Sequence, residues 1–260
     1  MKQLLFSSII FIFLYPSFIS AQKTDGIVTY RYVLNLFGVP NTQVATMYFN
    51  DTASVFIHSK GEEGEITKTE DGKDWDGKSY QERFGGWYQD SIGVVIFKNL
   101  KERKLAFREF VYAMPYVSEE PALPVQKWVI TPEKKNIGKF ACQRARTQFR
   151  GRIYDVWFTT EIPISNGPWK FQGLPGLILE AYDEKREVQF LFDKIEIPAA
   201  NPVKIPIFTG KKVDFATYKK ADDVEYTKWK KKGLSMDVLR GVTVTVSRPQ
   251  KHSIELEYEQ

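Results

Sequence analysis

The sequence is short of the residues from which most catalytic and cross-linked sites are built. Its one cysteine, Cys142, cannot form a disulfide within the chain, and we expect it to be a small buried residue. The two histidines, His58 and His252, each stand alone within a predicted strand, without the spacing of a zinc site. No phosphate loop, Gly-x-Ser-x-Gly elbow or His-Glu-x-x-His motif occurs. We therefore expect no metal, no cofactor and no catalytic residue, and the composition favours a protein that is not an enzyme.

The chain also lacks a concentration of positive charge. Its net charge of +5 falls to +4 when Lys2 is removed with the N-terminal segment, and basic and acidic residues are interleaved. A nucleic-acid-binding protein needs a basic stripe, so we expect no nucleic-acid partner. One dense basic cluster is present, and it fits a solvated helix end better than an anion or lipid-surface patch; its members are Lys228, Lys230, Lys231 and Lys232.

Long apolar runs are absent except at the N-terminus. Met1-Lys2 is followed by an apolar run from Leu4 to Tyr15, and the small residues Ser20-Ala21 precede Gln22. This pattern predicts a signal peptide over residues 1–21, cleaved near Ala21. The run is too short to span a bilayer comfortably, so a retained anchor is the weaker alternative. We expect an exported protein, periplasmic or extracellular, with no membrane span in the mature chain.

The dominant period of the mature chain is two, which is typical of strands with one buried and one wet face. Close spacing with Gly, Asn and Asp turns favours antiparallel pairing, and residues 242–247 and 253–259 predict a terminal hairpin. Residues 214–232 break the pattern and predict one or two short helices, with Asp214 or Asp222 as a cap. We expect one mainly β domain over residues 22–260. Further strands are predicted at residues 26–36, 43–50, 53–60, 91–98, 104–112, 140–149, 152–161, 177–183 and 187–197.

The loop from Ile162 to Gly176 is the most unusual piece of the sequence. Three prolines stiffen it and three glycines allow backbone angles that other residues avoid. Trp169 and Phe171 are two residues apart, so both rings point the same way if the stretch is extended. The loop therefore fits either the wall of a binding site or a plug that closes the open end of a sheet.

Carboxylates near this loop are the remaining candidates for acid–base chemistry. On strict alternation, Glu180 shares an apolar strand face with Ile178 and Tyr182, and such a carboxylate needs a partner. An ion pair with Arg150 or Arg152 is the simpler interpretation. The alternative is a hydrolase that uses Glu180 with Asp155 or Asp183.

Several motifs in the middle of the chain resemble the GLPGLI family of secreted, mostly Bacteroidetes proteins. The family takes its name from the hexapeptide that stands here as Gly173, Leu174, Pro175, Gly176, Leu177 and Ile178. The resemblance extends over roughly residues 100–200 and is most specific at residues 137–143, 149–152, 154–157 and 162–171, and at Glu180.

The resemblance implies a strongly curved antiparallel sheet, similar to the half-barrels of periplasmic lipoprotein carriers, and carries no catalytic residues. A related module precedes the catalytic part of some bacterial N-glycanases, for which we expect no room after the terminal hairpin. The leading hypothesis is a non-catalytic module that binds a lipid, a peptide or a glycan in the concavity. A structural partner of an outer-membrane complex is a further alternative. The hypothetical binding residues are Arg150, Arg152, Trp157, Trp169, Phe171, Glu180 and Tyr182.

Overall fold

The computed structural model describes residues 25–35, 40–60, 90–111, 114–200, 204, 208–228, 231 and 254–255. The predicted signal peptide, His252 and all but two residues of the predicted terminal hairpin lie outside these ranges. Within them, no helix combines the length and the hydropathy needed to cross a bilayer.

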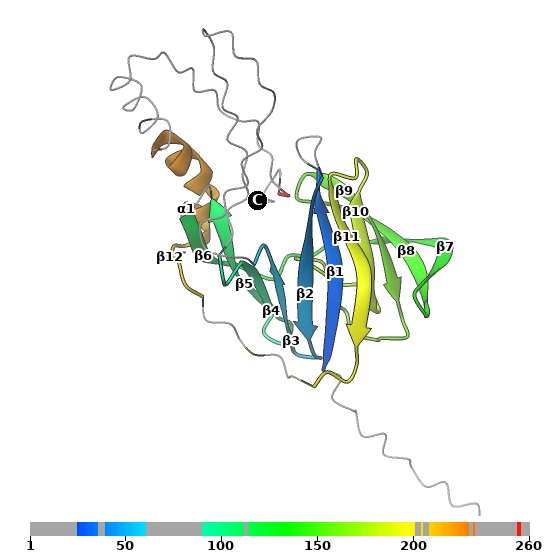
Figure 1. Ribbon diagram of the computed structural model, residues 1–260. Helices are drawn as coiled ribbons and strands as arrows, with labels where there is room; N and C mark the ends of the chain where they lie inside the picture. Colours follow the sequence, from blue (N-terminus) through cyan, green and yellow to red (C-terminus); the bar gives the residue numbers. More distant parts are fainter. Residues whose placement is uncertain are drawn as a thin grey trace, which may run out of the picture.

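One large, strongly curved sheet forms most of the described chain (Figure 1). Its strand order is β12-β6-β5-β4-β3-β2-β1-β11-β10-β9-β8-β7, with different strands at its two edges, so the sheet is open. The predicted mainly β, curved antiparallel fold is confirmed. The strands are β1 (Gly26–Leu34), β2 (Asn41–Phe49), β3 (Ala53–His58), β4 (Val94–Asn99), β5 (Lys104–Val111), β6 (Met114–Glu120), β7 (Val129–Ile137), β8 (Phe140–Phe149), β9 (Arg152–Thr159), β10 (Leu177–Asp183), β11 (Val188–Glu196) and β12 (Lys211–Lys212).

Three strands were not predicted. β6 and β7 lack clean alternation: β6 contains Pro115, and β7 is an exposed edge strand rich in Lys and Glu, with Pro132 inside it. Proline and charge are typical of strands at or near a sheet edge, where they weaken the strand signal. β12 is only two residues long and pairs with β6 in parallel, the exception in a sheet otherwise paired antiparallel.

Alternation assigns the side chains of each strand to two faces. The register joins Tyr30 to Ala45, Phe56 to Ile96 and Ile96 to Phe107, and these residues are fully buried. We call this side the inner face; on the other half of the sheet it carries Tyr154, Val156, Ala181 and Phe190. The opposite, outer face carries Arg31, which is exposed, and Trp157 and Tyr182, which are half-buried.

An irregularity in β10 corrects one prediction from alternation. Ile178 pairs with Phe158 and Glu180 pairs with Trp157, so one extra residue lies in β10 between two adjacent residues of β9. A bulge of this kind shifts the pleat by one position. Ile178 is therefore buried on the inner face, whereas Glu180 lies half-buried with Tyr182 on the outer face.

The predicted helical region is confirmed. α1 (Phe215–Lys219) begins after Asp214, whose carboxylate accepts a hydrogen bond from the Thr217 amide at 2.7 Å. A second helical stretch covers residues 221–228. Tyr218 packs on the inner-face ring of Phe107, with ring centroids 4.6 Å apart, and its hydroxyl donates to Glu109. The helices therefore lie beside β5 and β6, near one end of the sheet (Figure 1).

Candidate functional site

The loop of residues 162–176, called the plug loop below, packs against the inner face. The Oη of Tyr30 in β1 donates to the carbonyl oxygen of Ile178, just after this loop, at 2.8 Å, and Ser54 in β3 contacts Asn166 at 3.3 Å. From the other end of the sheet, Trp128 Nε1 donates to the carbonyl oxygen of Gln172 at 2.7 Å. Because strands from both halves reach the same loop, the sheet wraps around it, and the inner face is the concave face.

Trp169 and Phe171 lie at the centre of this packing. Their exposed fractions are 1% and 0%, and their ring centroids are 5.2 Å apart. Both rings contact Phe149, Tyr154 and Phe190. The backbone is turned rather than extended, with a φ of 51° at Trp169. This placement favours the plug alternative for both rings, and a role in ligand binding stays a prediction.

A buried lysine holds the plug loop from β4. The Lys98 side chain is fully buried, and its Nζ donates to the carbonyl oxygens of Gly167 at 2.7 Å and Phe171 at 2.9 Å. Burial lowers the pKa of Lys98 to about 7. Two loop carbonyls that would otherwise be buried without a donor are thereby satisfied.

A second buried lysine joins the plug loop to β6 and to the C-terminal segment. Lys170 Nζ is 2.8 Å from Glu120 and 2.5 Å from Glu255, and Arg150 also pairs with Glu120. Burial opposes the charge on Lys170, but the surrounding carboxylates outweigh it and raise its pKa. The cluster ties the turn after β8 to the far end of the sheet across the concavity. Arg152 forms a similar buried pair with Asp183, at 2.8 Å.

The named hexapeptide ends the plug loop and starts β10. Gly173 has a φ of 93°, which favours glycine. At Gly176 glycine is required by close packing: a Cβ there would collide with the backbone carbonyl of Thr159. Gly173 and Pro175 are exposed, and the other four members are buried; these are Leu174, Gly176, Leu177 and Ile178.

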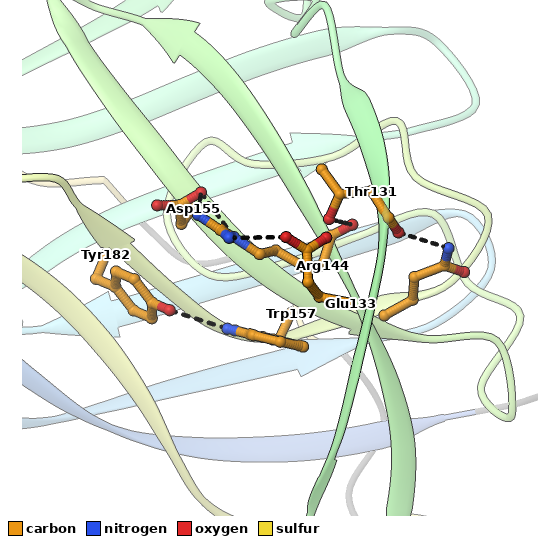
Figure 2. Close-up of polar contacts among 7 residues, drawn as sticks. Thr131, Glu133, Arg144, Asp155, Trp157 and Tyr182 are labelled. Atoms are coloured by element: carbon orange, nitrogen blue, oxygen red, sulfur yellow. Dashed lines mark hydrogen bonds and ion pairs between the residues drawn. The ribbon is translucent and has the colours of Figure 1, made fainter.

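The remaining predicted residues, Trp157, Glu180 and Tyr182, come together on the outer face of β9 and β10. Figure 2 shows Trp157 and Tyr182 side by side, with Arg144 and Asp155 near them. Trp157 Nε1 donates to Tyr182 Oη at 3.0 Å, which joins the two rings at their edges. Lys135 on β7 pairs with Glu180 at 2.5 Å. We call the whole group the outer-face cluster; it consists of Thr131, Glu133, Lys135, Arg144, Asp155, Trp157, Glu180 and Tyr182.

Cations lie over both rings of the cluster. Lys135 Nζ is 4.5 Å from the ring centre of Trp157, and the Arg186 guanidinium carbon is 3.3 Å from that of Tyr182. Arg144 bridges the carboxylates of Asp155, at 2.8 Å, and Glu133, at 3.3 Å (Figure 2). The ring faces of Trp157 and Tyr182 therefore attract positive charge at a surface that solvent partly reaches.

The carboxylate predictions need two corrections. The partner of Glu180 is Lys135, not Arg150 or Arg152, because the bulge in β10 turns Glu180 to the face opposite those arginines. Asp183 is paired with Arg152 and buried, so it does not share a face with Glu180. Asp155 does share the outer face with Glu180. Of the three carboxylates considered, only these two are placed to act on one molecule.

Sequence reasoning missed the lysines that organise both faces. Lys98 ends the apolar run Val94-Val95-Ile96-Phe97, and Lys170 stands between two buried aromatic residues. A lysine flanked by apolar residues was the available signal for these two. No such signal existed for Lys135, because β7 itself was not predicted. Among the described residues, no group of three or more His, Cys, Asp or Glu side chains is placed to hold a metal.

The chain is similar to one family model and to solved structures of one protein. A family model described as "Protein of unknown function (Porph_ging)" matches residues 146–180, from β8 through the plug loop into β10. No curated protein matches the chain. A structure of PNGF-II is similar with a TM-score of 0.50 at 16% identity, and a second crystal form gives 0.47 at 17%. Each match covers 76% of this chain and 32% of PNGF-II, so the chain spans about a third of that protein. At this identity the likeness concerns the fold alone.

Proposed function

We propose that this chain is an exported, non-catalytic binding module whose ligand or envelope partner meets the outer-face cluster. The observation that carries the proposal is the division of the predicted binding residues between two faces. Arg150, Arg152 and the plug-loop residues Trp169 and Phe171 are each at most 6% exposed. Trp157, Glu180 and Tyr182 are half-buried, adjacent and reachable from solvent.

The cluster has the properties of a binding surface. Rings, acceptors and donors stand on four neighbouring strands, so their spacing is set by backbone hydrogen bonds rather than by a loop. A carrier that holds its ligand in the concavity has less support, because the plug loop packs there. Export rests on the predicted signal peptide. A mature N-terminus at Gln22, measured by mass spectrometry of the envelope fraction, supports it, and an intact Met1 in the cytoplasm contradicts it.

Strand addition by an envelope partner is a second candidate, favoured by one observation. Among the described strands β7 pairs with β8 alone, and Val129 and Ile130 on it are 65% and 47% exposed. Pro132 and the register irregularity between Ile130 and Lys134 interrupt this edge, which limits a partner strand to its first few residues. The outer-face cluster therefore remains the leading candidate.

Retention of purified mature protein on washed envelope from its own host tests the proposal. Trp157→Ala should weaken retention, whereas Tyr48→Ala should not, since Tyr48 is a half-buried tyrosine on β2, outside the cluster. Equal retention of Trp157→Ala and the parent protein contradicts the proposal. If the parent protein hydrolyses a model glycoside or ester and Glu180→Gln does not, the hydrolase alternative is supported in place of the binding module.

A further inference from the structure

Resting on the proposed function, we infer that the ligand of the outer-face cluster is an uncharged glycan chain that lies across the rings of Trp157 and Tyr182. Cations already lie over the faces of both rings, at 4.5 Å and 3.3 Å from the ring centres. The face of an aromatic ring is the negative pole of its quadrupole. The C–H groups on one side of a pyranose ring are weakly positive, so the same faces attract them.

The two rings form a platform rather than a single contact. The hydrogen bond from Trp157 Nε1 to Tyr182 Oη fixes their edges together and leaves no strong polar group of Trp157 unsatisfied. Trp157 pairs with Glu180 and Asp155 pairs with Tyr182, so the two rings stand on diagonal neighbours of the paired strands β9 and β10, about 7–8 Å apart. A glycan chain that crosses both rings can therefore contact each ring with a different sugar.

Hydrogen-bonding groups stand beside the two rings. Glu180 and Asp155 supply acceptors beside the rings, and Arg144 and Lys135 supply donors. Hydroxyls both donate and accept, so a mixed set of this kind suits them better than it suits a lipid tail, which would leave these charged groups buried without water.

The charge of the cluster selects an uncharged glycan over an acidic one. Lys135 and Arg144 of the cluster, with Arg186 over the Tyr182 ring, supply three cations, and three carboxylates offset them, those of Glu133, Asp155 and Glu180. Each cation lies on a carboxylate or a ring. A polyanion therefore gains no excess positive charge here and must displace existing pairs.

Periodate treatment of the envelope tests the inference. Periodate cleaves vicinal diols of sugars; after borohydride reduction, the treated envelope should lose the Trp157-dependent part of retention. Protein-free and lipid-free polysaccharide released from the same envelope should compete for the parent protein. Trp157→Ala should weaken binding of this polysaccharide by about tenfold or more, and Tyr182→Ala serves as a second variant if Trp157→Ala does not fold.

Controls separate the glycan from other ligands. Raising the salt concentration should not weaken binding of the polysaccharide to the parent protein, because an uncharged chain forms no ion pairs; a marked loss points to an anionic ligand and overturns the inference. Tyr48→Ala should bind like the parent. If retention still depends on Trp157 after periodate treatment, the ligand is not a glycan. The proposal of a binding module then stands, and only the inference about its ligand is overturned. If retention on untreated envelope does not depend on Trp157, the proposed binding function of the outer-face cluster is itself contradicted. Failure of the inference and failure of the proposed function therefore give different results.

Discussion

Lys98 donates a hydrogen bond from its buried Nζ to the carbonyl oxygen of Phe171, 73 residues away, at 2.9 Å. The lysine belongs to β4 and the phenylalanine to the plug loop that enters β10, so the bond joins the two halves of the curved sheet through its interior. The same Nζ also holds Gly167 O. The relationship explains how an open sheet keeps a defined curvature: the chain supplies its own interior layer.

The ring of Trp169 should matter for folding rather than for binding. Trp169→Ala should lower the free energy of unfolding by about 3–5 kcal/mol, the usual cost of deleting a large buried aromatic side chain. Urea denaturation measures it. At a temperature where the variant is folded, its retention on envelope should equal that of the parent. A variant that unfolds like the parent but loses binding would return Trp169 to the list of binding residues.

Lys98 should give the protein a recognisable dependence on pH. Its pKa is lowered by burial from 10.5 to about 7, so between these values the unfolded chain binds a proton that the folded chain lacks. Stability from this group therefore rises as pH increases from about 7 to 10, by up to about 1.4 kcal/mol per pH unit. The slope should be flatter in Lys98→Met, measured by urea denaturation at each pH. Parallel curves for the two proteins would contradict the placement of Lys98.

The ion cluster around Lys170 should be sensitive to loss of one partner. Glu120→Gln should destabilise the fold by about 3–5 kcal/mol, because it leaves buried Lys170 and Arg150 short of countercharge. The exposed pair Lys104–Glu102 is the control, and Lys104→Ala should change stability little. Similar melting temperatures for Glu120→Gln and Lys104→Ala would show that the cluster carries little of the stability.

Gly176 should tolerate no side chain. Gly176→Ala places a Cβ against the Thr159 carbonyl in the paired strand β9, so β10 must shift and the melting temperature should fall clearly. Pro175→Ala, one residue earlier and exposed, should change it little. Equal melting temperatures would mean that the backbones of Thr159 and Gly176 are not in close approach.

The class of fold could be predicted from the sequence because its strands alternate cleanly. Asn41–Phe49, for example, alternates throughout, with Ala45, Met47 and Phe49 buried and the residues between them more exposed. The edge strand β7 could not, because solvent exposure removes the apolar half of the pattern. The bulge between Ile178 and Glu180 could not either, since it depends on pairing with β9. That one irregularity decides which predicted site residues share a face, so the candidate residues could be named from sequence but not assembled into a site.

The most direct test of the outer face as the binding surface needs no substitution. Exposed lysines of the parent protein are acetylated with and without saturating envelope polysaccharide, and each site is quantified by mass spectrometry. Lys135 lies over the Trp157 ring with its side chain 37% exposed, so it should be protected when ligand covers the rings. Lys104, on β5 with a 67% exposed side chain, should be labelled equally in both states. Unchanged labelling of Lys135 at saturation, with protection elsewhere, would contradict the outer-face cluster as the site.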